Sequence, residues 1–236
     1  MKKISLILAC FNDELSIKES TKRIINILDI TKYEYELIFI DDASEDNSSK
    51  IISNVQNHHH SKNILSIFHT ENIGRGGTVK EGILKAKGDI VGFVDIDLEV
   101  SENYLPAFIR AIDLGADVAI GSRSYKFQIT GPHRYLGSVI YPILVRRLLL
   151  LPFKDTEAGY KFFNRKKILP IVKKTEDNGW FWDTEIIARA FFANLKIVEI
   201  PILFQRRPEK KSTVKFMRDS WRQLQRLLVF KESFKE

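Results

Sequence analysis

The 236-residue chain has one cysteine and few glycines and prolines, and each scarcity excludes a class of protein. Cys10 alone cannot form an internal disulfide or a multi-cysteine zinc site, so nothing in the sequence points to an oxidising compartment. Twelve glycines and seven prolines are too few for a collagenous or low-complexity chain. The hydrophobic share of 44% instead indicates a globular protein with a substantial core.

Long apolar runs are also missing. No stretch reaches the roughly 18 residues expected of a membrane span, and the longest candidate, residues 139–151, is interrupted by Arg146 and Arg147. The first apolar run, residues 4–9, is shorter than the ~7–15 residues of a signal-peptide core and is followed at once by polar residues. We therefore expect a buried first strand and a cytoplasmic protein, either free or peripheral on a membrane surface.

The two halves of the chain differ in charge. The net charge is +7, but residues 1–120 have a balance of −6 and residues 121–236 a balance of +13. An acidic half followed by a basic half indicates two tasks, such as a metal site and an anionic partner. The anionic partner could be a membrane surface or a phosphorylated ligand. Nucleic acid fits less well, because the acidic half would repel its backbone, and we expect none.

Hydrophobic periodicity predicts strands that alternate with helices over the first 120 residues. Repeated β-α-β units with short connections imply an α/β fold with a mostly parallel, Rossmann-like sheet flanked by helices. Strands are expected at residues 4–9, 37–40, 64–68, 90–94 and 118–120, and helices at 15–28, 47–55, 78–87 and 104–112.

The second half is less regular. The pattern predicts a helical stripe at residues 136–144, a strand at 159–163, a helix at 184–192, a strand at 197–200 closed by Pro201, and a helix from 214. We interpret residues 1–212 as one compact domain and residues 213–236 as a basic amphipathic extension. Arg218, Arg222 and Arg226 form its basic stripe, beside an apolar face that includes Trp221, Leu224 and Leu228.

Three carboxylates, Asp95, Asp97 and Glu99, leave the end of the strand expected at residues 90–94. This edge of an open parallel sheet is where ligands bind. An extended segment would point all three carboxylates the same way, and such oxygen ligands suit Mg²⁺ or Mn²⁺ with a substrate phosphate completing the shell. The alternative is a solvated acidic turn. The strand end and the third carboxylate favour the metal site.

Asp41 and Asp42 end the second expected strand at the same edge. They can accept hydrogen bonds from a nucleotide or cap the next helix, and one residue can do each.

The Gly-rich turn at residues 72–77 is more typical of a tight turn than of a phosphate loop, because no G-K-[ST] ending follows. Arg75 in that turn could still reach a diphosphate. The three consecutive histidines at 58–60 do not share a face, so we do not interpret them as metal ligands.

Six blocks of the sequence, in order, resemble family 2 glycosyltransferases with the GT-A fold. The resemblance is to the polyprenyl-phosphate sugar synthases, a group that includes dolichyl-phosphate mannosyltransferases. The blocks are LILACFNDE, ELIFIDDASEDNS, ENIGRGGTVKEGILKAKGDIVGFVDIDLE, GSR, DTEAGYKFF, and WFWDTE followed by IVEIP, which together span about residues 4–215. The chain departs from the family pattern at Arg75, where Lys is usual, at Glu99, where Gln is common, and at residues 209–212, where a G-S-K-like turn is usual.

The resemblance implies a set of site residues. Catalytic roles fall on Asp97, Asp155 and Asp183, and metal ligation on Asp95, Asp97 and Glu99. The acceptor phosphate would be bound by Arg123, Arg134 and Ser138. The nucleotide sugar would be bound by Ala9, Phe11, Asn12, Glu14, Asp41, Asp42, Arg75, Asp95, Arg207 and Lys211.

The implied reaction is an inverting transfer of mannose or glucose from a GDP- or UDP-linked donor to a polyprenyl or dolichyl phosphate, with Mg²⁺ or Mn²⁺ as cofactor. A phosphate acceptor needs no general base, because its second pKa is about 6, and Asp155 and Asp183 would then orient substrate. With a sugar hydroxyl as acceptor, Asp183 would be the base.

Two alternatives to the lipid-phosphate acceptor are a family 2 enzyme that glycosylates a cell-surface glycan and a non-catalytic nucleotide-sugar-binding subunit. The acidic triad argues against the second. Residues 136–151 and the C-terminal helix are expected to rest on an anionic membrane at its cytoplasmic face, and a membrane-anchored partner subunit would serve the same location.

Overall fold

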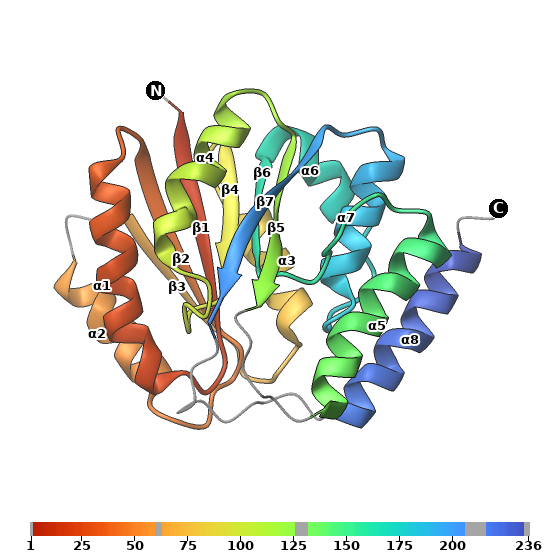
Figure 1. Ribbon diagram of the computed structural model, residues 1–236. Coiled ribbons are helices and arrows are strands. Elements are labelled where there is room, and N and C mark those ends of the chain that lie inside the picture. Colours follow the sequence, from red (N-terminus) through yellow and green to blue (C-terminus); the bar gives the residue numbers. More distant parts are fainter. Residues whose placement is uncertain (1, 60–62, 126–131, 206–215, 234–236) are drawn as a thin grey trace.

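The structure, a computed structural model, describes residues 2–59, 63–125, 132–205 and 216–233 (Figure 1). Side chains are described for these residues except 125, 132–139 and 216–220. No helix in these ranges is both long and apolar enough to cross a bilayer.

One sheet runs through the centre of the described chain, with strand order β3-β2-β1-β4-β6-β5-β7. Of these strands only β6 is antiparallel to its neighbours, β4 and β5. The α/β architecture with a mostly parallel sheet is therefore confirmed. The strands are β1 (Lys3–Cys10), β2 (Glu34–Asp41), β3 (Asn63–Phe68), β4 (Ile90–Val94), β5 (Val118–Tyr125), β6 (Tyr160–Asn164) and β7 (Ile197–Phe204).

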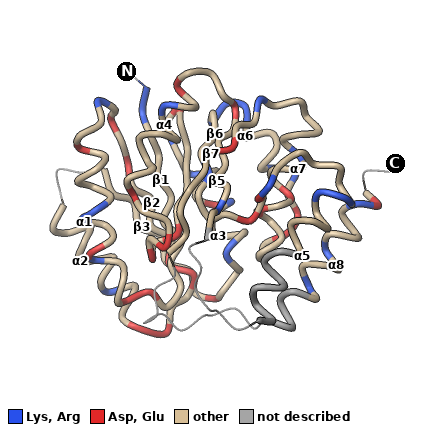
Figure 2. Tube along the Cα trace, in the orientation of Figure 1, with Lys and Arg blue, Asp and Glu red and all other residues tan. Residues whose placement is uncertain are grey.

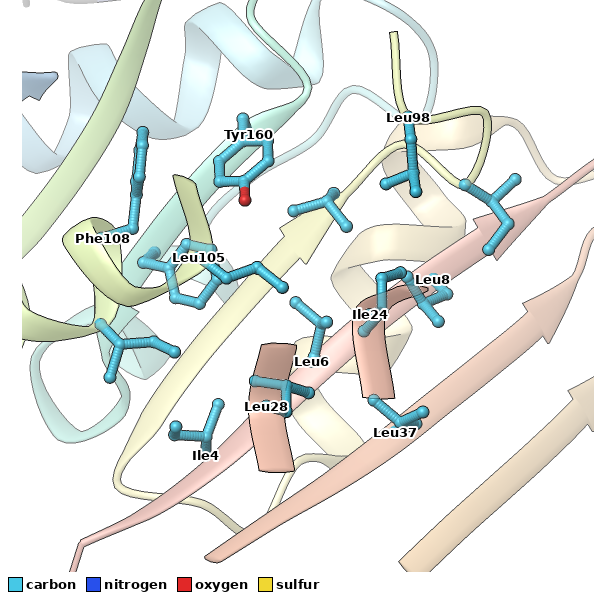
Figure 3. Packing of buried hydrophobic residues seen from close by; sticks show 14 of the residues in the cluster. Ile4, Leu6, Leu8, Ile24, Leu28, Leu37, Leu98, Leu105, Phe108 and Tyr160 are labelled. Carbon is cyan, nitrogen blue, oxygen red and sulfur yellow. The ribbon is translucent and has the colours of Figure 1, made fainter. Parts of the chain in front are cut away.

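Helices cover both faces of the sheet, because side chains along each strand alternate between the faces. On one face, Ile4, Leu6 and Leu8 of β1 pack against α1 (Glu14–Ile30), α2 (Ser48–His58) and α4 (Leu105–Asp113), which follows a 3₁₀ turn at Glu102–Tyr104. Figure 3 shows this cluster, with Leu6 beside Leu28 of α1 and Leu105 and Phe108 of α4 nearby.

The opposite face buries Ile7 of β1 under α3 (Arg75–Lys85), α6 (Arg165–Val172) and α7 (Trp182–Phe192). Two further helices, α5 (Pro132–Leu149) and α8 (Phe216–Glu232), lie side by side at the end of the molecule farthest from α1 and α2 (Figure 1). Leu227 and Phe230 of α8 are buried in this second cluster, which joins α8 to the rest of the fold.

The structure differs from the sequence-based predictions in several elements. The helix expected from residue 78 begins at Arg75, so the second half of the Gly-rich turn, residues 75–77, belongs to the first turn of α3. β7 continues through Pro201 to Phe204, which is tolerated because β7 is an edge strand and proline's missing N–H costs no ladder bond there. The helix α6 was not expected, since it is short and contains Pro170.

The strand order creates a switch point between β1 and β4. From β1 the sheet extends to β2 and β3 on one side, and the chain then returns to place β4 on the other side. Ligands in open α/β sheets bind outside the carboxyl ends of the strands at such a point. Figure 2 shows acidic residues gathered at this lower edge of the sheet, whereas Lys and Arg occur along α8.

Candidate active site

Two loops at the carboxyl edge are joined by hydrogen bonds. The Asn12 N–H donates to Ser44 Oγ at 2.9 Å, and Asn12 Oδ1 accepts from the Glu45 N–H at 2.8 Å. Glu14, the first residue of α1, accepts from Asn47 Nδ2 at 2.8 Å. The segment that runs from Ala9, in β1, through Phe11 to Glu14 therefore lies next to the loop after β2, so the structure brings these nucleotide-binding candidates together.

Asp41 and Asp42 are both buried at this edge, with 2% and 3% of their surfaces exposed. Asp41 Oδ1 accepts from the Ser44 hydroxyl at 2.5 Å. Asp42 accepts from the backbone N–H groups of Ile73 at 2.9 Å and Gly74 at 3.0 Å. Asp42 therefore anchors the chain entering α3, and the expectation that it caps the next helix, α2, is wrong.

His69 follows β3 and connects two carboxylates beside that anchor. Its Nδ1 lies 2.8 Å from Asp42 Oδ1 and its Nε2 lies 3.0 Å from Glu81 Oε2. Burial alone would lower the pKa of His69, but the hydrogen bonds to Asp42 and Glu81 outweigh it, so the pKa is raised above its ordinary value.

The acidic segment after β4 is a turn and not an extended strand. The Leu98 N–H donates to the Asp95 carbonyl at 3.1 Å, and Leu98 has a φ of +51°. The alternation expected of Asp95, Asp97 and Glu99 is therefore wrong, because a turn does not keep the two-residue period of a strand. Within the described ranges, no three His, Cys, Asp or Glu side chains are grouped so that they could hold a metal ion.

The turn nevertheless fits a cation that is shared with a substrate. Mg²⁺ is commonly held by one or two carboxylates together with substrate phosphates. The Asp95 side chain is half exposed, and a Cβ on Gly159 would lie 1.9 Å from its Oδ2, so the glycine leaves room for this carboxylate. Asp97 is 7% exposed and follows it in the same turn. These two oxygen donors fit the metal that the resemblance implies.

A network of two cations and two carboxylates lies behind the turn. Arg75 at the start of α3 donates from Nη2 to Asp95 Oδ1 at 2.7 Å and from Nη1 to Asp183 Oδ2. Lys161 of β6 donates to Asp183 Oδ1 and to the Ala158 carbonyl, both at 2.5 Å. Both carboxylate oxygens of Asp183 are thus occupied by cationic donors.

The pKa values of both cations, Lys161 and Arg75, are affected by burial. Lys161 is 0% exposed, and this burial lowers the pKa of its ammonium although Asp183 opposes the change. Burial would also lower the pKa of Arg75, but Asp183 and Asp95 outweigh it and raise that pKa above its ordinary value.

Arg123 and Asp155, to which the sequence assigns different roles, are partners. Arg123 of β5 donates from Nε to Asp155 Oδ2 at 2.6 Å and from Nη2 to Asp155 Oδ1 at 3.0 Å. Burial alone would raise the pKa of Asp155, but Arg123 outweighs it, and the pKa lies below its ordinary value. This two-point pairing places the acceptor candidate Arg123 beside a carboxylate.

Several predicted site residues are not described. Arg134 and Ser138 belong to α5, but their side chains lie outside the described set. Arg207 and Lys211 lie outside the described residues altogether. The side chain of Arg218 in α8 is likewise outside the description.

The sequence-based reasoning missed Lys161, His69 and Trp180. Lys161 is a charged residue inside an otherwise apolar strand, and that contrast was a usable signal. His69 directly follows β3 at the same edge as Asp42. Trp180, which is 38% exposed, lies with its ring 5.5 Å from the guanidinium of Arg75, a contact that no sequence spacing indicates.

The fold and this edge define an α/β protein of the GT-A type, with acidic and basic groups at the switch point of its sheet. Residues 5–172 match the model of the family described as "Glycosyl transferase family 2". The chain belongs to this family.

Curated relatives cover most of this chain but are longer proteins. Glycosyltransferase AglD of Haloferax volcanii is 27% identical over 227 residues, which are 92% of this chain and 35% of that protein. The dolichyl-phosphate beta-glucosyltransferase of Dictyostelium discoideum is 28% identical, with 84% of this chain and 65% of the relative covered. That of Saccharomyces cerevisiae is 29% identical, with 71% and 56% covered. The chain thus spans about a third of AglD and less than two thirds of the other two proteins.

Solved structures share the fold at low identity. Glucosyl-3-phosphoglycerate synthase from Mycobacterium tuberculosis, in complex with Mn²⁺, UDP-glucose and phosphoglyceric acid, has a TM-score of 0.72 and 16% identity, covering 98% of this chain and 80% of that one. The same enzyme with Mg²⁺ and UDP has a TM-score of 0.71 and 17% identity, with the same coverage. Divalent cations and UDP therefore occur together in proteins of this fold.

Proposed function

We propose that the chain transfers a hexose, with inversion, from a nucleotide-diphosphate sugar to a polyprenyl phosphate. The pairing of Asp183 and Asp155 with cations carries this proposal. A hydroxyl acceptor must lose a proton during attack and benefits from a free carboxylate base. Asp183 is instead engaged by Lys161 and Arg75, and Asp155 by Arg123. A phosphate acceptor is already a dianion near neutral pH and needs no such base.

The names of the relatives support the same acceptor and favour glucose over mannose. Two of the relatives described above are dolichyl-phosphate beta-glucosyltransferases, and a third protein, 30% identical over 52% of this chain, is the undecaprenyl-phosphate 4-deoxy-4-formamido-L-arabinose transferase of Proteus mirabilis. All three names describe the transfer of a sugar to a polyprenyl phosphate. We therefore propose UDP-glucose as the first donor to test.

The chain's own groups would divide the work along the edge of the sheet. The linked loops around Asn12 and Asp41 would hold the nucleoside. Arg75 would face the diphosphate, held in place by Asp95 and Asp183. Asp95 and Asp97 would hold Mg²⁺ or Mn²⁺, which when bound neutralises charge that develops on the departing diphosphate. Arg123 would direct the acceptor phosphate toward the anomeric carbon.

The test is product formation with purified protein. UDP-glucose, GDP-mannose and related donors are incubated with Mn²⁺ or Mg²⁺ and either a polyprenyl phosphate or a glycan acceptor. We expect a glycolipid with the polyprenyl phosphate and none with Asp97→Asn, circular dichroism serving as the control of fold. If a product forms with the glycan acceptor but not with the polyprenyl phosphate, the proposed lipid-phosphate acceptor is wrong. Donor binding without any product would favour a non-catalytic subunit.

We further propose that α5 and α8 rest on an anionic membrane at its cytoplasmic face, with residues 213–236 acting as a basic extension of the catalytic domain at residues 1–212. α5 exposes Ile140 and Ile143, and α8 exposes Trp221, Leu228 and Val229, with 62% of Trp221 accessible. Arg222 and Arg226 lie among the exposed side chains of α8. Apolar side chains beside basic ones suit the headgroup boundary of a bilayer, and a membrane-anchored partner subunit would reinforce this location.

A further inference from the structure

Glu157 lies where four elements meet around Arg123. It belongs to the segment between α5 and β6, and its Oε2 lies 3.7 Å from Nη2 of Arg123 on β5. On its other side, Oε1 accepts from Nε2 of Gln223 on α8 at 3.2 Å. The Glu157 N–H donates to Asp155 Oδ1 at 2.9 Å, so Glu157 and Asp155 flank the same guanidinium.

Charged groups from several elements act on this side chain. Arg123 of β5, Asp155 of its own segment and Asp183 of α7 all influence the charge of Glu157, and Gln223 of α8 and Tyr141 of α5 interact with it. The charge of Asp183 is itself matched by Lys161 and Arg75. The Glu157 side chain is 22% exposed. Burial raises the pKa of Glu157 to about 7, Arg123 opposes that change, and Asp155 and Asp183 add to it.

We propose that Glu157 controls the charge around Arg123, so that the acceptor phosphate binds at Arg123 together with a proton taken up by Glu157. This inference rests on the proposed phosphate acceptor. When Glu157 is ionised, Arg123 faces two carboxylates, and the three groups together carry one net negative charge, which repels a phosphate dianion. A protonated Glu157 leaves the trio neutral, and its O–H can donate to a phosphate oxygen.

The same linkage favours product release. The acceptor is a phosphate monoester dianion, and glycosyl transfer to one of its oxygens makes a phosphodiester with a single negative charge. The leaving nucleoside diphosphate takes the electron pair of the broken glycosidic bond, and no proton is consumed in the transfer itself. Because the diester repels an ionised Glu157 less than the monoester did, Glu157 returns its proton to solvent as the product leaves.

The first measurement is the pH dependence of acceptor KM and kcat, separately, between about pH 6.5 and 8.5. In the wild type, acceptor KM should rise above pH 7 by up to about tenfold per pH unit, as linkage to one proton requires. In Glu157→Gln the KM should be nearly independent of pH over that range. The ionisation of the acceptor phosphate also affects KM, but it affects both proteins equally and does not change the comparison. Glu34→Gln, an exposed glutamate at the amino end of β2, is the matched control and should follow the wild type.

Two results of this measurement would overturn the inference. Equal pH slopes of KM in the wild type and Glu157→Gln would show that Glu157 does not govern binding. A kcat that rises with pH through 7 in the wild type and is lost in Glu157→Gln would instead make Glu157 a general base for a hydroxyl acceptor.

A second measurement does not depend on turnover. Calorimetry with a water-soluble short-chain prenyl phosphate at pH 7.5, in two buffers of different ionisation enthalpy, counts the protons bound with the ligand. We expect the wild type to take up most of one proton more than Glu157→Gln. The same proton count in both proteins, or no binding to the wild type, overturns the inference. If glycolipid forms but the proton counts are equal, the proposed function stands and the role of Glu157 is wrong. If the proton counts differ but no glycolipid forms, Glu157 governs phosphate binding and the proposed transferase function is wrong.

Discussion

Lys161 carries an ammonium group in the middle of a buried strand, and its partners make that placement tolerable. Its side chain is 0% exposed and donates to Asp183 and to the Ala158 carbonyl. A buried charge that loses its partner is strongly destabilising, whereas replacing both partners by neutral groups is often nearly neutral. The pair therefore predicts strong coupling between the two positions.

We expect Lys161→Met to lower the free energy of unfolding by about 3–5 kcal/mol. Lys161→Met combined with Asp183→Asn should lose clearly less than the sum of the two single changes, because both charges of the Lys161–Asp183 pair are then removed, while Arg75 keeps Asp95. Denaturant unfolding of the four proteins measures this coupling. Lys173→Met, at an exposed lysine, is the control and should change stability by less than about 0.5 kcal/mol. Additive losses would contradict the pairing.

Ala43 stands in the left-handed region of backbone space, with a φ of +59°, in the loop after β2. A Cβ makes this conformation unfavourable by roughly 1–2 kcal/mol, and glycine adopts it freely. We expect Ala43→Gly to raise the free energy of unfolding by about 1 kcal/mol. Ala111→Gly, inside α4, should lower it by about 1 kcal/mol, because glycine in a helix is unfavourable. Two changes of the same sign, measured in urea, would refute the strain at Ala43.

At the scale of elements, α8 buries apolar side chains on one side and exposes them on another. Leu227 and Phe230 are buried against the fold, whereas Trp221 and Leu228 are 62% and 47% exposed. Leu224 is only partly exposed. The apolar face expected from the sequence is therefore exposed or partly exposed, and Leu227 and Phe230, which were not expected, make the contact with the core. Helical periodicity does not distinguish a face that packs on protein from one that is left at the surface.

We expect the protein to sediment with anionic vesicles, and Arg222→Glu with Arg226→Glu to weaken that binding. Each basic residue near an anionic surface contributes about 1 kcal/mol, and salt screens this attraction. Binding should fall at high salt without reaching zero, since the exposed apolar side chains add a salt-insensitive part. Lys166→Glu with Lys167→Glu, exposed on α6, makes the same change in charge and should bind almost as the wild type does. Equal losses in both double variants would contradict docking through α8.

At the scale of the whole molecule, the acidic turn and the loops at the switch point make one composite site. No group of three potential metal-ligating side chains occurs in the described part of the chain, and Asp95 and Asp97 supply the oxygen donors at the turn. Mg²⁺ and Mn²⁺ should therefore bind weakly without the diphosphate that completes their shell. Metal and nucleotide binding are expected to reinforce each other.

Thermal unfolding tests this reinforcement. Ligands that bind only the folded state stabilise it by RT ln(1 + [L]/Kd), about 2.7 kcal/mol at a hundredfold excess over Kd. For a chain of this length we expect UDP with Mn²⁺ to raise the Tm by about 5–10 °C. Mn²⁺ alone should shift it by much less, and UDP with EDTA should give an intermediate result. A full shift with Mn²⁺ alone would show a metal cage made by the protein itself.

The amino-acid sequence by itself determined the order of the strands and of the helices other than α6, and the placement of carboxylates at strand ends. These features depend on the local period of apolar residues and on which polar residues follow each apolar run, so they can be read within a short window. Asp42 and Asp95 were recognised in this way as residues of the carboxyl edge, and Arg75 as a residue that could reach a diphosphate. The six blocks likewise indicated the family that the match over residues 5–172 bears out.

The tertiary structure alone decided how those side chains pair. Arg75 meets Asp183 across 108 positions of sequence, Arg123 meets Asp155 across 32, and Lys161 meets Asp183 across 22. The reversed direction of β6 brings Lys161 to Asp183, and the turn at Asp95 breaks the alternation that an extended strand would have kept. Partners so far apart are chosen by the packing of the whole sheet, and electrostatic pairing then follows from distance and burial rather than from any local pattern.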